Sequence, residues 1–185
     1  MGIKKARLFA MLSDVGELPH RMDFSCYIGK SRVLCLDYGD RRIGVAISDI
    51  GWRIGSPVTV LDNHGAFRRL FHLIEIYEIS IVILGFPVSL KGEKRGMQAD
   101  KIKAFGQKLE KLIEQQEADV RVLLWDERFS TQAAHRILSE IGASDSRKKK
   151  EIDKVAASFV LQGFLDWVKN NTSNDNSPEN ETTFG

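Results

Sequence analysis

Two short apolar runs separated by six mostly polar residues constrain the fold more than any other feature of the sequence. The runs are residues 33–36 and 43–47, and the hexapeptide between them begins with Asp37 and ends with Arg42. Short apolar runs bounded by turn-forming residues predict strands, so this stretch predicts a hairpin. Asp37 follows the first run directly and is expected at the carboxyl end of the first strand. An aspartate there ordinarily caps a turn, so any chemistry depends on other carboxylates that converge on it.

The remaining chain predicts an α/β fold built on one mixed sheet. Apolar runs predict strands at 32–37, 42–49, 58–61, 79–84 and 120–125. Apolar periodicity and helix caps predict helices at 64–78, 98–116, 132–141 and 151–169, with a polar loop at 89–96. The first three strands predict an antiparallel meander, to which the strand–helix units that follow add two further strands. Helices are therefore expected on both faces of the sheet.

Composition indicates one globular domain. With 185 residues, 43% hydrophobic and 28% charged, the chain is long enough for one domain with a substantial core. We assign this domain to residues 32–169 and regard residues 1–31 as an extension before it. Residues 170–185 are expected to be a disordered tail, because Asn, Ser, Thr, Asp and Glu dominate there.

The cysteines and the hydropathy suggest where the protein works. Cys26 and Cys35 lack the spacing of metal ligands, and Cys35 falls inside an apolar run. That arrangement is typical of a buried thiol in a reducing compartment. No apolar run approaches the length that spans a membrane. The expected location is the cytoplasm.

Three carboxylates could meet at one edge of the predicted sheet. Asp37 ends the first strand and Glu127 follows the last one, so both reach the same edge if the two strands are neighbours. Asp153 lies three and four residues before Ala156 and Ala157, on the face of the last helix that is expected to pack on the sheet. For Asp153 alone, the ordinary explanation is the preference of acidic residues for a first helical turn.

Carboxylates without an accompanying His or Cys cluster are typical of a site for a hard cation. The four histidines are scattered, at His20, His64, His72 and His135. Mg²⁺ or Mn²⁺ prefers oxygen ligands and keeps waters or phosphate oxygens in its shell. Two such ions about 3.5–4 Å apart would activate a water and stabilise the leaving oxygen in phosphodiester hydrolysis.

Basic residues are clustered near these carboxylates in the sequence. The net charge is only +2, so contact with nucleic acid would need local patches. The candidates are Arg41, Arg42, Lys94, Arg95, Arg128, Lys148, Lys149 and Lys150. Runs of lysine and arginine are more often plain solvated surface, so no single patch decides the function.

Four motifs, in order, resemble the YqgF family. They are residues 36–49 around Asp37, residues 85–87, residues 126–131 around Glu127, and residues 149–157 around Asp153. The family comprises bacterial proteins with a ribonuclease-H-like fold, described as Holliday junction resolvases and as pre-16S ribosomal RNA nucleases. The resemblance implies that Asp37, Glu127 and Asp153 are catalytic carboxylates that bind metal. The chain departs from the family's usual residues at Phe86 and at 89–92.

The leading hypothesis is therefore a metal-dependent endonuclease for structured RNA, at the 5′ end of the 16S precursor, or for branched DNA. The basic residues named above would bind phosphates, independently of sequence. One alternative is a nuclease-fold protein that binds nucleic acid without cutting it. An ATPase of the actin or sugar-kinase type would need two lobes, for which the chain is too short. The sequence leaves open RNA against DNA, and a monomer against a homodimer.

Overall fold

The computed structural model describes residues 23–86, 93–126 and 146–172, with side chains except at 93–95 and 146–154. Five strands form one sheet in the order β3-β2-β1-β4-β5. Their bounds are Arg32–Tyr38 (β1), Arg42–Ser48 (β2), Gly55–Asp62 (β3), Ile79–Phe86 (β4) and Arg121–Asp126 (β5). β2 is antiparallel to β1 and β3, whereas β4 is parallel to β1 and β5. The predicted mixed sheet, a meander with two added strands, is confirmed.

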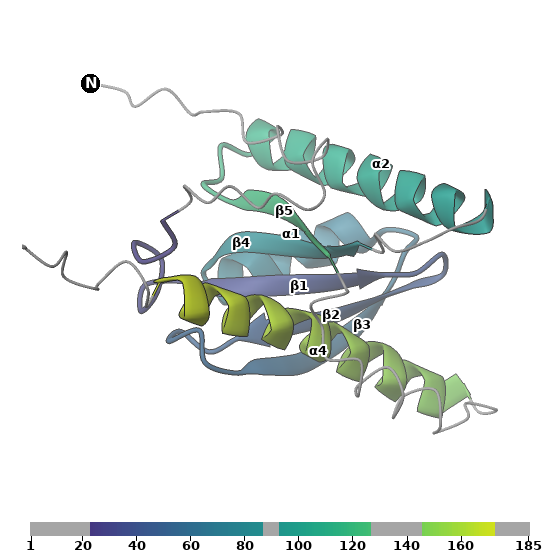
Figure 1. The fold of residues 1–185 in the computed structure, drawn as a ribbon. Coiled ribbons are helices and arrows are strands. Elements are labelled where there is room, and N and C mark those ends of the chain that lie inside the picture. The colour runs from purple at the N-terminus through teal and green to yellow at the C-terminus, as the bar shows by residue number, and fades with distance from the viewer. Residues whose placement is uncertain (1–22, 87–92, 127–145, 173–185) are drawn as a thin grey trace, which may run out of the picture.

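Helices cover both faces of this sheet, as predicted. α1 (Ala66–Ile76) and α2 (Glu93–Gln115) lie on one face, and α4 (Ser146–Thr172) crosses the other (Figure 1). The predicted helix at 132–141 falls outside the described residues. Within the described ranges, no helix has the length and apolar character needed to cross a membrane.

The central strand β1 divides the core into two layers. Leu34 and Leu36 belong to the layer that contains α1 and α2, whereas Val33 and Cys35 belong to the layer that contains α4. None of these four side chains is exposed. A strand that is buried on both faces explains the uninterrupted apolar run at 33–36.

Three elements, β3, α2 and α4, differ most from the bounds predicted from the sequence. β3 begins at Gly55, three residues before the predicted start, because its pairing with β2 continues to Ser48 and Gly55, and the Gly55 amide also donates to Gln162 Oε1 of α4 at 3.0 Å. α2 begins at Glu93, so the second half of the predicted loop at 89–96 is helical. α4 runs from Ser146 to Thr172, longer at both ends than predicted, and its last residues fall within the segment predicted as a tail.

The segment before β1 packs into the α4 layer. Phe24 is 2% exposed, and its ring lies edge-on to Phe164 at 5.6 Å and to Trp167 at 6.2 Å. Tyr27 stacks on Trp52 with 6.5 Å between ring centroids. Sequence analysis assigned this part of the extension no role, because two isolated aromatic residues give no periodic pattern. In the structure they close one end of the core.

We expect Phe24→Ala to lower the free energy of unfolding by about 3 kcal/mol, because the change leaves a cavity between α4 and the loop that carries Trp52. Chemical denaturation followed by circular dichroism measures the loss. Cys26→Ala is the matched control, since Cys26 is exposed on the same segment, and it should stay within about 0.5 kcal/mol of wild type. Equal effects of the two changes would contradict this role for Phe24.

Glu110 of α2 combines partial burial with a like charge nearby. Burial raises the pKa of its carboxyl group to about 7, and the Glu114 carboxylate one helical turn later contributes to the same shift. The ordinary pKa of 4.5 applies in the unfolded chain, so the folded protein holds more protons between pH 4.5 and about 7. The free energy of unfolding therefore falls as the pH rises through that window and the Glu110 carboxyl group ionises.

Glu110→Gln should raise the melting temperature by about 2 °C at pH 8, where wild type carries the unfavourable charge. At pH 5 the variant and wild type should melt closer together, because Glu110 is then mostly protonated. Calorimetry at both pH values provides the measurement. Glu75→Gln, on the exposed side of α1, should show no such difference between the two pH values.

Candidate functional site

Asp37 lies near the carboxyl end of β1, on the face that α4 covers. Side-chain direction alternates along a strand, and Val33 and Cys35 belong to the α4 layer, so Asp37 follows them on that face. Its partner on β2 is Gly44. On the other side, Gly85 comes one residue after Leu84, the β4 partner of Leu36. Both neighbours of Asp37 on the adjacent strands are therefore glycines, which have no side chain.

The strands β1 and β5 are not neighbours, contrary to the condition under which Asp37 and Glu127 were expected to meet. β4 lies between them, so their backbones are about 10 Å apart at two strand spacings. The three strands are parallel, however, and they end at the same edge of the sheet. Gly85 is the β4 residue that pairs with Trp125, so β4 places no side chain between β1 and β5 at this level.

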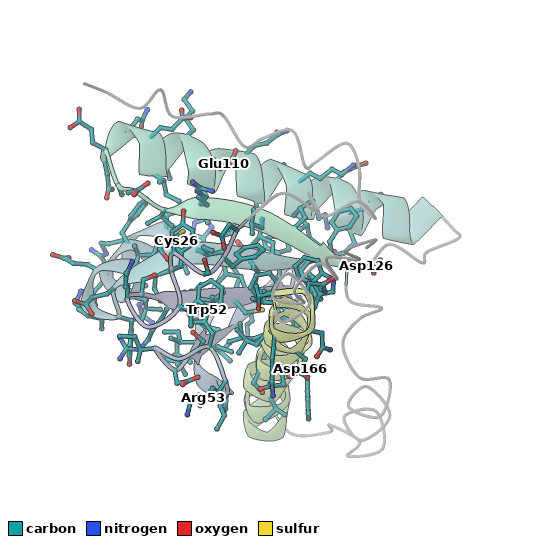
Figure 2. All side chains as sticks on the ribbon, turned by 60° about the vertical axis from the view of Figure 1, so that its left-hand side comes forward. Cys26, Trp52, Arg53, Glu110, Asp126 and Asp166 are labelled. Atoms are coloured by element: carbon teal, nitrogen blue, oxygen red, sulfur yellow. The ribbon has the colours of Figure 1, made fainter. Side chains whose placement is uncertain are left out.

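The end of β5 carries a buried carboxylate that was not among the predicted site residues. Asp126 is 5% exposed and pairs with Phe86 at the edge where β4 and β5 end (Figure 2). Alternation from Trp125, in the α4 layer, puts Asp126 on the opposite face. Its position directly after a buried apolar run was the available sequence signal. The predicted Glu127 follows it in the chain and lies outside the described residues, as does Arg128.

The third predicted carboxylate, Asp153, belongs to the first half of α4. Position 153 is one helical turn before Ala157, which is fully buried against the sheet. Positions 148–150 lie in the first turns of the same helix. The structure describes the backbone of these positions and not their side chains.

The described parts of the predicted basic stretches lie at the end of the sheet where β1, β4 and β5 end. Arg41 is exposed in the turn after β1, and Arg42 is half-buried at the start of β2. α2, which carries positions 94 and 95 at its start, and α4 both begin on the side where β1, β4 and β5 end (Figure 1). The described backbone positions 41–42, 94–95 and 148–150 therefore lie toward the end of the sheet that carries Asp37, whereas Arg128 lies outside the described residues.

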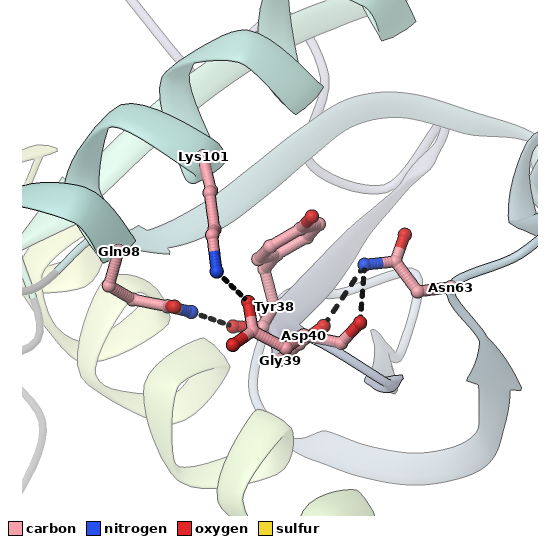
Figure 3. Close-up of polar contacts among 6 residues, drawn as sticks. All are labelled: Tyr38, Gly39, Asp40, Asn63, Gln98 and Lys101. Carbon is pink, nitrogen blue, oxygen red and sulfur yellow. Dashed lines mark hydrogen bonds and ion pairs between the residues drawn. The ribbon is translucent and has the colours of Figure 1, made fainter.

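The turn between β1 and β2 is held by residues that the sequence analysis did not identify. Asn63 Nδ2 donates to the carbonyl oxygens of Gly39 and Asp40 at 3.1 and 3.3 Å (Figure 3). From α2, Gln98 Nε2 donates to the Tyr38 carbonyl at 3.0 Å, and Lys101 Nζ lies 2.6 Å from Asp40 Oδ1. These contacts come from separate elements, so no spacing in the sequence indicates them.

The donor set suits a hard cation rather than a soft one. Asp37 offers carboxylate oxygens on the α4 face, Asp126 lies on the opposite face, and the thiol of Cys35 is buried within β1. Among the residues whose side chains are described, no three of His, Cys, Asp and Glu form a cluster that could hold a metal ion. Of the three predicted ligands, only the side chain of Asp37 is described.

Gly39→Ala should destabilise the turn that follows Asp37. A Cβ atom at Gly39 would lie 2.7 Å from the Arg42 carbonyl oxygen, so the backbone must shift. We expect a loss of about 2 kcal/mol in unfolding free energy, measured by urea denaturation. Gly96→Ala is the control, because a Cβ there meets no atom within 4 Å and alanine favours the helix by about 0.5–1 kcal/mol. A neutral Gly39→Ala would contradict the close approach.

Comparison with protein families matches residues 31–167 to the family described as "RuvX: Holliday junction resolvase". Two relatives carry the name "Putative pre-16S rRNA nuclease". The protein of Acetivibrio thermocellus is 40% identical over 139 residues, which cover 73% of this chain and 95% of the relative. That of Caldicellulosiruptor saccharolyticus is 39% identical over 140 residues, covering 74% and 98%. Among solved structures, T. thermophilus RuvC in complex with a Holliday junction substrate matches at 13% identity with a TM-score of 0.49, over 74% of this chain and 96% of that one.

Proposed function

Because the chain belongs to the RuvX family, we propose that it is an endonuclease that processes the 5′ end of the precursor of 16S ribosomal RNA. The family and its named relatives are nucleases, which hydrolyse phosphodiester bonds. The RNA substrate is taken from relatives that are 39–40% identical to this chain and are matched over 95–98% of their length. Such a substrate would be met in the cytoplasm.

The observation that carries the proposal is the setting of Asp37. Its carboxylate lies at the carboxyl edge of the sheet, on the α4 face, between Gly44 and the level of Gly85. Ligands of open α/β sheets bind at the edge where parallel strands end, and a carboxylate there can bind a phosphodiester through a divalent cation.

The family implies a divalent cation, and the carboxylate of Asp37 is an oxygen ligand of the kind that such a cation takes. Asp37 and Glu127 would hold it, and Asp153 would complete its shell; Mg²⁺ and Mn²⁺ both accept such oxygen ligands. When bound, the cation supplies a more acidic water and neutralises charge on the leaving oxygen. The chain's own residues orient the phosphodiester, and Asp153 helps to orient the attacking water.

Arginine and lysine side chains around the edge would bind the substrate backbone. We assign this role to the hairpin turn at Arg41 and Arg42, to Lys94 and Arg95, to Arg128, and to Lys148, Lys149 and Lys150. The common location of the starts of α2 and α4 supports the assignment (Figure 1). Binding of this kind is independent of sequence and weakens as salt rises.

The description of the matching family favours a second candidate, resolution of Holliday junctions. That reaction requires two symmetric cuts, so it would be carried out by a homodimer, whereas RNA processing can be carried out by a monomer. The two candidates share one catalytic site and differ in the nucleic acid that reaches it. An assay with both substrates separates them.

Asp37→Asn should lower the cleavage rate by at least about 100-fold, because the amide has no negative charge with which to hold the cation at the reacting phosphate. The test compares wild type, Asp37→Asn and Glu127→Gln with Mn²⁺ or Mg²⁺, on a 16S precursor end and on a four-way DNA junction. Asp119→Asn is the control, because Asp119 is exposed just before β5 begins, at the opposite edge of the sheet. The control should cut as wild type does.

Cleavage of the RNA alone would support the first candidate, and cleavage of the junction alone would support the second. Undiminished cleavage by Asp37→Asn would contradict the site. Tight binding of either substrate by wild type without cleavage would contradict an enzymatic function and favour a protein that only binds nucleic acid. The melting temperature of each variant should stay near that of wild type.

A further inference from the structure

We propose that α2, through Lys101 and Gln98, positions the turn after β1 and so holds Asp37 in the geometry that cleavage needs. The inference rests on the proposed nuclease function and goes beyond it, because neither residue is expected to touch the substrate. Lys101 and Gln98 are positioning residues that act through the backbone of residues 38–41. Asp37 is the residue immediately before that turn.

Three contacts from α2 fall on two residues of the turn, Tyr38 and Asp40. Gln98 binds the carbonyl of Tyr38 at 3.0 Å, and Lys101 binds the carboxylate of Asp40 at 2.6 Å (Figure 3). The ring of Tyr38 also packs against Phe105, with 4.9 Å between the centroids. α2 thus holds both the residue after Asp37 and the tip of the turn.

The hairpin closes without α2. Gly39 N donates to the Arg42 carbonyl at 2.9 Å, and β1 pairs with β2 up to Tyr38 and Ile43. Asn63, after β3, adds its own bonds to the turn from the far side. The contacts from α2 are therefore not required to form the turn. They fix its tilt relative to the sheet, on the side from which α2 approaches.

Stability alone gives little reason for the Lys101–Asp40 pair. The two side chains are 45% and 59% exposed, and an exposed ion pair of this kind contributes about 0–1 kcal/mol. The cleavage rate is far more sensitive to the position of a catalytic group, since a displacement of about 1 Å can lower the rate about 100-fold. A weak pair next to Asp37 can therefore affect catalysis while it leaves the fold almost unchanged.

A direct phosphate contact is the competing role for Lys101. In the structure its ammonium group is already paired with Asp40, within hydrogen-bond distance. The two roles make opposite predictions for Asp40→Asn. Removal of the Asp40 charge would leave a phosphate-binding lysine available and so strengthen substrate binding, whereas it would impair a positioning lysine as much as loss of the lysine itself does.

The test measures kcat, KM and the salt dependence of KM for Lys101→Met, Asp40→Asn and the double variant, on whichever substrate wild type cuts. We expect each single change to lower kcat about 10-fold with KM nearly unchanged. The double variant should be no worse than either single variant, because both remove one interaction. Lys101→Arg should restore most of the rate. Lys111→Met, at an exposed lysine ten residues further along α2, is the matched control.

Hydrogen exchange supplies a readout that does not depend on activity. The amides of residues 38–42 should exchange faster in Lys101→Met and Asp40→Asn than in Lys111→Met, at equal melting temperatures. Raised KM with a weaker salt dependence in Lys101→Met, and lowered KM in Asp40→Asn, would overturn the inference in favour of a phosphate contact. If wild type cuts and the kcat of Lys101→Met and Asp40→Asn is unchanged, the inference is wrong and the proposed function stands. If wild type cuts nothing, both the inference and the proposed function are wrong.

Discussion

Burial of β1 on both faces is the constraint on which the rest of the structure depends. The four residues before Asp37 have no exposed surface, and successive residues face α1 and α2 on one side and α4 on the other. Each layer therefore needs its own helices, and the sheet must continue on both sides of β1. The strand becomes half-buried only at Asp37 and Tyr38, where the layers end. A charged group can lie there because water reaches it from the edge.

The proposed site is a consequence of this layered arrangement. The parallel strands β1, β4 and β5 end at one edge, and the long helices α2 and α4 start beside it. Residues that are up to about a hundred positions apart in the sequence are thereby brought to one end of the molecule. Glycines at positions 44 and 85 are the neighbours of Asp37 on β2 and β4, so neither strand places a side chain beside the carboxylate.

Prediction from the sequence succeeded where a single segment determines its own structure. The strands were identified because each apolar run is buried as a unit, and α1 because its apolar residues recur with helical period. The position of β4 between β1 and β5 depends on the pairing of distant segments, which no local pattern records. The start of α2 was missed because its first turn is Glu, Lys, Arg and Gly, without apolar periodicity. Asn63 and Lys101 were missed because their roles are set by the neighbours that folding brings to them.

The aromatic cluster of the α4 layer has a consequence for spectroscopy. Trp52, Trp125 and Trp167 all belong to this layer or pack against it, and they are the only tryptophans of the chain. Rings of Phe24 and Phe164 lie between them, at 5.3–6.2 Å from the nearest indoles. Intrinsic tryptophan fluorescence therefore reports on the docking of α4 and of the segment before β1. Loosening of α1 and α2 from the opposite face would leave that emission unchanged, and tyrosine absorbance at Tyr38 and Tyr77 would be the signal that follows it.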